Sequence, residues 1–182
     1  MSRKILILAG AGVLAVILLV WISGLPSLRA PSKKIECLAD ELAAPPFSLY
    51  DLKGEKVDSS AFLGKAVVLD FWATWCPPCR AMIPGLNELY QKHREEGLVV
   101  VGVSMDQGGP EVVRKFVEKM GVEYPNLMGD AVVLEAYSRI PGMGPIVGIP
   151  TTFLINRKGQ ICHRFTGFTE KRLLEDMVNR LL

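Results

Sequence analysis

Residues 66–79 read AVVLDFWATWCPPC, and they carry the strongest signals for the fold. Its first seven residues are apolar except for Asp70, and such a run is typical of a strand buried on both faces of a sheet. Cys76 and Cys79 follow, separated by two prolines, and residues 77–96 place apolar side chains at helical spacing. The stretch therefore predicts a buried strand that leads into a helix, with a CxxC pair at the junction.

The position of the two cysteines predicts redox chemistry. Cysteines three residues apart at a helix start lie close enough to form a disulfide. The helix N-terminus stabilises the thiolate of Cys76, and the thiolate is the attacking species in disulfide exchange. The alternative is half of a zinc site, but the sequence has no second CxxC and no HxxxH to complete it. We therefore expect a redox-active pair and no metal.

The rest of the chain alternates between strand and helix patterns. A turn at residues 51–54 predicts an N-terminal β-hairpin, and a second apolar run at residues 98–104 predicts another buried strand. Helices are expected at residues 110–120, 131–137 and 169–182, and strands at residues 125–128, 151–155 and 160–165. This order predicts an α/β domain in which helices flank both faces of a mixed sheet, whose last strand is antiparallel.

An apolar run opens the chain. Residues 5–22 are 18 uncharged positions, which as a helix measure about 27 Å and just span a bilayer core. We expect residues 1–22 to be a signal anchor or a signal peptide; the weak cleavage sites favour a retained anchor. Prolines mark residues 23–44 as a linker, which leaves residues 45–182 for one folded domain. Two basic residues precede the run and three follow it, so their count does not set the orientation.

The charge distribution argues against nucleic-acid binding. The formal charge is +2, but residues 1–34 hold five basic residues and no acidic one. The remaining chain therefore has 16 basic against 19 acidic residues, a net charge of −3. A mildly acidic domain is a poor candidate for a nucleic-acid partner.

Three segments resemble the thioredoxin superfamily. DFWATWCPPC at residues 70–79, together with the preceding residues 45–72, is most similar to the membrane-tethered TlpA/ResA-like branch. GIPTTFLINRKG at residues 148–159 resembles the cis-proline strand and hairpin of the superfamily. The resemblance covers residues 45–182 and implies a thioredoxin-like mixed sheet flanked by helices, thiol–disulfide oxidoreductase activity and no cofactor.

The same resemblance assigns roles to single residues. Cys76 would be the attacking thiolate and Cys79 the resolving thiol, while Trp75 would form a wall of the site. Pro150 would be cis and lie beside the cysteines. The backbone of Ile149 would then pair with an extended segment of the substrate.

Asp70 stands inside an otherwise apolar strand. An ionised carboxylate is costly there, so we expect its pKa to be raised. Such an acid near Cys79 would accept the proton of that thiol during resolution, which makes Asp70 a candidate catalytic residue. The alternative is an acid whose side chain is capped or turned to the surface.

The chain departs from the TlpA/ResA-like pattern at four places. Asp70 replaces a residue that is often neutral, Met82 replaces a frequent glutamate, and VVVGVSM at residues 99–105 lacks the lysine of ordinary thioredoxins. Residues 138–147 form a longer connection than usual before the cis-proline. This Gly/Pro-rich loop is interpreted either as a partner-recognition element or as simple loop variation.

These observations favour an extracytoplasmic thiol–disulfide oxidoreductase. TlpA/ResA-like proteins typically reduce specific envelope proteins, for example apocytochromes c or metallochaperones, with electrons from a membrane thiol donor. The resemblance implies a single-pass protein of the inner or cytoplasmic membrane with a periplasmic domain, or a secreted one after cleavage. A copper-handling or thiol-binding module of the same fold is the alternative, although related copper chaperones prefer CxxxC with a distal histidine. A peroxidase would need Thr-x-x-Cys before the helix, which residues 74–76 do not supply.

Two cysteines lie outside the CxxC pair. Cys37 precedes the domain, and Cys162 falls on the last expected strand, near a sheet edge. Because some TlpA-like proteins are thought to carry a second, structural disulfide, a Cys37–Cys162 bond is expected; two separate thiols are the alternative. Such a bond persists only in an oxidising compartment, so it would also place the domain outside the cytoplasm.

Overall fold

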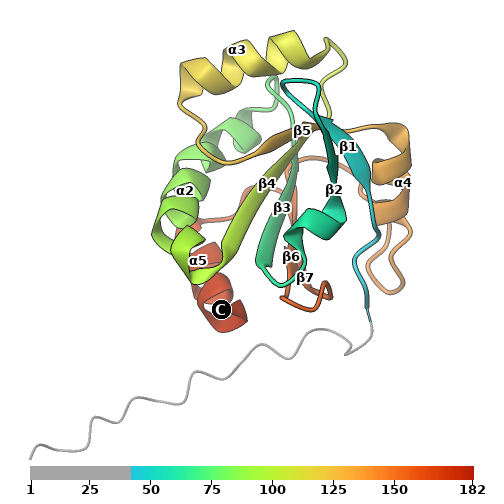
Figure 1. Cartoon of the computed structure of the whole chain (residues 1–182), viewed down its shortest axis with the longest axis vertical. Coiled ribbons are helices and arrows are strands. Elements are labelled where there is room, and N and C mark those ends of the chain that lie inside the picture. The colour runs from blue at the N-terminus through green and yellow to red at the C-terminus, as the bar shows by residue number, and fades with distance from the viewer. Residues whose placement is uncertain (1–41) are drawn as a thin grey trace, which may run out of the picture. The chain divides into compact units, whose positions relative to one another are not determined.

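The computed structural model describes residues 42–182. These residues form a seven-stranded sheet flanked by helices (Figure 1). The expected membrane helix, most of the expected linker and Cys37 lie outside the described residues. Within residues 42–182, no helix is both long enough and apolar enough to cross a membrane.

The elements follow one another along the chain in nearly the expected order. The strands are β1 (Ser48–Asp51), β2 (Lys56–Asp58), β3 (Ala66–Trp72), β4 (Leu98–Ser104), β5 (Asn126–Met128), β6 (Thr151–Ile155) and β7 (Ile161–Thr166). The α-helices are α2 (Pro77–His93), α3 (Pro110–Met120), α4 (Ala131–Ser138) and α5 (Lys171–Leu181), and η1 (Ser59–Phe62) and η2 (Arg94–Glu96) are short 3-10 helices. The helix expected at residues 77–96 is thus an α-helix that ends in a 3-10 turn.

The sheet is mixed, as expected. Its strand order is β2-β1-β5-β4-β3-β6-β7. Strands β3, β4 and β5 run parallel, whereas β6 is antiparallel to β3 and β7 is antiparallel to β6. Because β3 and β4 are buried along their whole length at the centre of the sheet, the end of β3 provides a rigid base for the cysteines that follow it.

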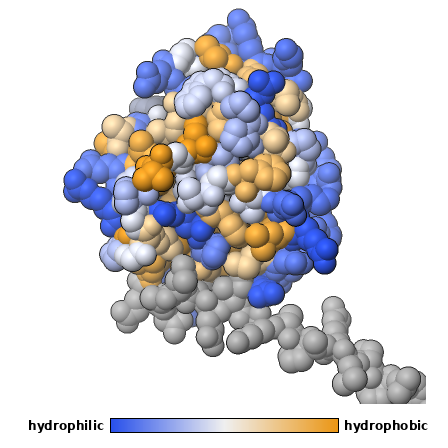
Figure 2. All heavy atoms as spheres, turned by 180° about the vertical axis from the view of Figure 1, so that it is seen from behind, coloured by the Kyte–Doolittle hydropathy of each residue, from blue (hydrophilic) through white to orange (hydrophobic). Residues whose placement is uncertain are grey.

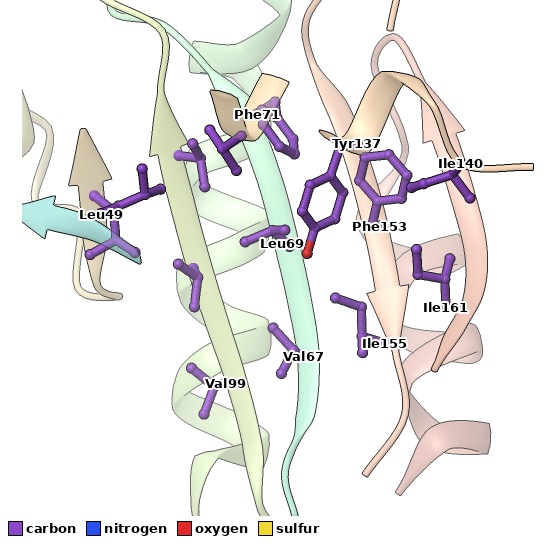
Figure 3. Packing of buried hydrophobic residues seen from close by; sticks show 14 residues of the cluster. Leu49, Val67, Leu69, Phe71, Val99, Tyr137, Ile140, Phe153, Ile155 and Ile161 are labelled. Atoms are coloured by element: carbon purple, nitrogen blue, oxygen red, sulfur yellow. The ribbon is translucent and has the colours of Figure 1, made fainter. Parts of the chain in front are cut away.

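One face of the sheet packs against α4. Alternate residues of β3 point to this face, and Leu69 and Phe71 are fully buried there (Figure 3). The rings of Phe71, Tyr137 and Phe153 pack with centroids 5.0–5.9 Å apart. This cluster joins α4 to the central strands.

The opposite face packs against α2 and α5, which lie side by side in Figure 1. Val68 of β3 belongs to the same buried cluster as Leu86 of α2 and Leu174 of α5. Towards the end of β3, Trp72 packs in a cluster with Cys79. Since Asp70 lies between Val68 and Trp72 on the same side of the strand, its side chain faces α2.

The first described residues run along the start of β7. The amide of Ile161 donates to the carbonyl of Leu42, and the amide of Ala44 donates to the carbonyl of Gly159, both at 2.8 Å. The chain therefore enters the fold beside the edge strand that carries Cys162.

The surface of the molecule mixes apolar and hydrophilic side chains. Figure 2 shows the face turned away from the viewer in Figure 1, where apolar residues lie in several patches separated by hydrophilic ones.

Candidate active site

Cys76 and Cys79 form a disulfide at the start of α2. Their Cα atoms are 5.3 Å apart. Cys76 is the N-cap of the helix, with extended backbone angles, and its Sγ accepts a hydrogen bond of 3.3 Å from the amide of Cys79. Pro77 occupies the first helical position, where its fixed φ suits the helix. An N–H at this position would have no partner within the helix, so its absence in proline costs no hydrogen bond. The positive end of the helix therefore points at the sulfur of Cys76.

Both cysteines are nearly enclosed. Cys76 is 3% exposed and Cys79 is 1% exposed. Of the two, Cys76 lies at the start of the helix, ahead of its first turn. Cys79 lies inside the first turn, three residues further along the chain.

The cis-proline segment lies beside Cys76. The peptide bond between Ile149 and Pro150 is cis. The carbonyl oxygen of Ile149 is 3.7 Å from the Sγ of Cys76, and the amide of Gly167 donates to the carbonyl of Pro150 at 2.8 Å. The structure thus brings the two sequence motifs, 70–79 and 148–159, into one site.

Exposed apolar side chains come from the segments around this site. Trp75 precedes Cys76 and is 66% exposed, Val147 lies before the cis-proline and is 81% exposed, and Phe168 follows Gly167 and is 54% exposed. These three side chains leave apolar surface exposed in the segments that adjoin Cys76 and Pro150 in the chain or by hydrogen bonding.

The loop between α4 and β6 is held to the body of the domain at several points. The amide of Ile146 donates to the Oγ of Ser138 at 3.2 Å, and the Nη1 of Arg164 donates to the carbonyl of Gly144 at 2.8 Å. Ile140 is buried in the same core cluster as Tyr137 and Phe153. These anchors fix the loop and leave Val147 pointing to solvent.

Asp70 is buried, 1% exposed, on the side of β3 that faces α2. Its Oδ1 accepts a 2.7 Å hydrogen bond from the hydroxyl of Thr152, which lies opposite it on β6. Burial raises the pKa of the Asp70 carboxyl from 3.8 to about 7, and the hydrogen bond from Thr152 opposes the rise only in part. Of the two alternatives for this residue, the structure thus supports the buried acid and not the surface-turned one.

Gly102 explains why no lysine accompanies Asp70. It is the residue of β4 that pairs with Asp70 in the register of the sheet. A Cβ atom built on Gly102 would lie 2.3 Å from the Oδ1 of Asn126 and 2.7 Å from the Nε1 of Trp72. A side chain at this position would clash, so the strand offers the carboxylate no neighbouring cation there.

Met82 takes the place of the frequent glutamate. It is buried, 3% exposed, in the apolar cluster between α2, α5 and the sheet. A carboxylate at this position would lie among apolar side chains, so Met82 fills the core and carries no charge to the site.

Sequence reasoning missed a carboxylate next to the CxxC turn. Asp106, two residues beyond the end of β4, accepts hydrogen bonds from the backbone and the hydroxyl of Thr74. The sequence did offer a signal, because Asp106 is a lone acid that follows a buried strand. Parallel strands end at the same edge of a sheet, so an acid after β4 lies at the edge where the cysteines follow β3.

Cys162 lies on the edge strand β7, as expected, and is 1% exposed. Its expected partner, Cys37, lies outside the described residues, so the bond between them stays a prediction.

The fold and the site together define a class of protein. A CxxC pair at a helix start, following a central strand and facing a cis-proline, is the arrangement that the thioredoxin resemblance implied. The chain is therefore a thiol–disulfide oxidoreductase with a thioredoxin-like fold.

Comparison with known proteins gives the family. Residues 41–164 match the AhpC/TSA family, and the chain belongs to it. It is 39% identical over 134 residues to the thiol-disulfide oxidoreductase ResA of Geobacillus kaustophilus, covering 72% of each chain. It is 32% identical over 145 residues to ResA of Bacillus subtilis, covering 79% of this chain and 76% of the relative.

Solved structures agree with this assignment. A thiol:disulfide interchange protein of the thioredoxin family from Chlorobium tepidum is 29% identical, with a TM-score of 0.70, and the match covers 77% of this chain and 95% of that one. StoA from Bacillus subtilis is 25% identical with a TM-score of 0.61, over 74% of this chain and 97% of that one.

Proposed function

We propose that this protein reduces disulfides of specific envelope proteins on the extracytoplasmic side of the membrane. The observation that carries the reaction is the Cys76–Cys79 pair at the start of α2, beside the carbonyl of Ile149. The apolar run at residues 5–22 and the similarity to proteins named ResA support the membrane-anchored placement.

The reaction starts from the reduced pair. The Cys76 thiolate attacks one sulfur of the substrate disulfide, a mixed disulfide forms, and the other substrate sulfur leaves as a thiolate. Cys79 then loses its proton and attacks the Sγ of Cys76, which releases the second substrate thiol. The substrate gains two electrons, and the protein ends with the Cys76–Cys79 disulfide. A membrane thiol donor reduces this disulfide for the next cycle.

Asp70 is the proposed proton acceptor for Cys79. Its carboxyl faces α2, the helix that carries Cys79, and its pKa of about 7 lies where a group both takes and releases protons near neutral pH. Asp70→Asn keeps the size and the hydrogen bond to Thr152 but cannot accept a proton. The variant should form mixed disulfides at the normal rate and resolve them more slowly; resolution at the wild-type rate would remove Asp70 from the reaction.

The substrate is held beside the cis-proline. The backbone of Ile149 offers its polar groups to an extended segment of the partner, and Trp75 and Val147 contact apolar side chains that flank the partner's cysteine. The loop at residues 138–147 would then select among partners. Replacing Val147 by Glu should weaken binding of a partner and leave reaction with a small disulfide unchanged.

The reaction is tested by disulfide reduction in the presence of dithiothreitol. The full-length protein should accelerate reduction of insulin disulfides, and a Cys76→Ser variant should not. If the protein instead binds one Cu⁺ tightly through Cys76 and Cys79 and fails to accelerate the reduction, the copper-handling alternative replaces the proposed function.

A further inference from the structure

Asp106 is a nearly buried carboxylate that the exchange reaction itself does not use. It is 8% exposed. Its Oδ2 accepts hydrogen bonds from the amide of Thr74 at 2.9 Å and from the Oγ of Ser104 at 2.8 Å. Its Oδ1 accepts a third, from the hydroxyl of Thr74 at 2.6 Å. Three donors on one buried carboxylate hold it in a single orientation, because bonds to a charged acceptor are the stronger kind.

The fold brings this carboxylate to the CxxC turn. β3 and β4 are parallel neighbours that end together, with Trp72 paired to Ser104. The amide of Met105 donates to the carbonyl of Trp72 at 2.8 Å, which joins the chain after β4 to the end of β3. Asp106 therefore lies beside Thr74, the second residue beyond β3.

The turn held by Asp106 connects β3 to the reactive cysteine. The amide of Cys76 donates to the carbonyl of Ala73 at 3.2 Å, and the amide of Thr74 is bound by Asp106. Trp75 stands between these two attachment points, with its side chain 66% exposed. The position of Trp75, which directly precedes Cys76 in the chain, thus depends on Thr74 staying where Asp106 holds it.

We infer that Asp106 is a positioning residue for disulfide exchange with protein substrates. By fixing Thr74 through its backbone and its hydroxyl, the carboxylate places Trp75 beside Cys76 as a wall for the bound partner. A small disulfide reaches the Sγ of Cys76 without that wall. Loss of Asp106 therefore affects protein substrates more than small ones.

The test compares two disulfides on the full-length protein. With insulin, Asp106→Ala should raise KM roughly tenfold, because a misplaced binding surface loses its fit to the partner. With the small disulfide dithiobis(nitrobenzoate), the rate of the reduced protein should stay within about twofold of the wild type. Asp106→Asn should restore the KM for insulin, since its Oδ1 accepts from the amide of Thr74 and its Nδ2 donates to the hydroxyl.

Two further variants separate positioning from general loss of stability. Asp51→Ala removes a carboxylate whose Oδ1 likewise accepts two turn amides, those of Lys53 and Glu55, at 2.8 Å each, in the hairpin between β1 and β2. It should leave both reactions unchanged. Thr74→Val removes a single hydrogen bond to Asp106 and should raise the KM for insulin in the same direction, even if Asp106→Ala does not fold.

Three results would overturn the inference. The first is an unchanged KM for insulin in both Asp106→Ala and Thr74→Val. The second is a parallel loss of rate with insulin and with the small disulfide. The third is a failure of Asp106→Asn to restore the KM, which would mean that the charge of Asp106 and not its hold on Thr74 matters.

Discussion

The buried carboxyl of Asp70 should make the stability of the protein depend on pH. Asp70→Asn is the matching perturbation, because the amide has the size of the carboxyl and still accepts the hydrogen bond from Thr152. The only property removed is the negative charge in an enclosed, apolar site. We therefore expect the variant to be more stable than the wild type wherever that charge would form.

The magnitude follows from the pKa. In the folded protein the pKa of Asp70 is raised from 3.8 to about 7. Between these values the folded state binds more protons than the unfolded state, so stability falls as the pH rises through this window. A tenfold change in an equilibrium constant corresponds to about 1.4 kcal/mol, so the full rise corresponds to roughly 4 kcal/mol. Well below pH 3.8, both states are protonated and wild type and variant should match.

The assay is urea unfolding of oxidised full-length protein from pH 4 to pH 8, since the oxidised CxxC pair adds no titrating thiol. The free energy of unfolding of the wild type relative to Asp70→Asn should decline between pH 4 and pH 7 and then level off. If the stability deficit of the wild type stays constant across this range, or becomes larger towards low pH, the folded-state pKa of Asp70 is not raised.

Three further results are expected. In the reduced protein, alkylation at mildly acidic pH should label Cys76 before Cys79, as mass spectrometry of the peptides will show; the opposite order would reverse the assignment of the attacking thiol. Non-reducing peptide mapping should find Cys37 joined to Cys162, and two unjoined cysteines would contradict the prediction. Because the bond closes a loop of about 126 residues, a variant without it should lose on the order of 4–5 kcal/mol of stability. Gly102→Ala should lower the free energy of unfolding by about 1–3 kcal/mol, because the added Cβ would clash with the side chains of Asn126 and Trp72. An unchanged urea midpoint would show that these side chains move aside without cost.

The elements around the site could be predicted because their local signals agree with the tertiary structure. The apolar run at residues 66–72 is long enough to predict a central strand. The prolines at residues 77 and 78 favour a turn that leads into a helix, so all three elements could be predicted from local residues. The burial of Asp70 followed from its place in that run. The cis bond at Pro150 followed from the family resemblance and not from the residues alone.

Other features depend on contacts between distant segments, which no local pattern reveals. Asp106 is visible in the sequence as an acid after a buried strand, but only the register of β3 and β4 shows that it reaches Thr74. The charged neighbours of His93 predict a solvated side chain, yet it is 3% exposed; its Nδ1 lies 2.9 Å from Glu96 and its Nε2 lies 4.0 Å from Glu175 of α5. Gly102 shows its role only when the side chains of the adjacent strands are in place.

In the proposed reaction, Cys76 attacks the substrate and Cys79 resolves the mixed disulfide. Trapping measures this directly: Cys79→Ser and Cys76→Ser variants of the full-length protein are expressed in the cell, and covalent complexes are separated without reductant. We expect Cys79→Ser to accumulate complexes with envelope proteins through Cys76, located by mass spectrometry, and Cys76→Ser to accumulate none. Complexes formed by Cys76→Ser through Cys79, or no complexes with either variant, would contradict this expectation.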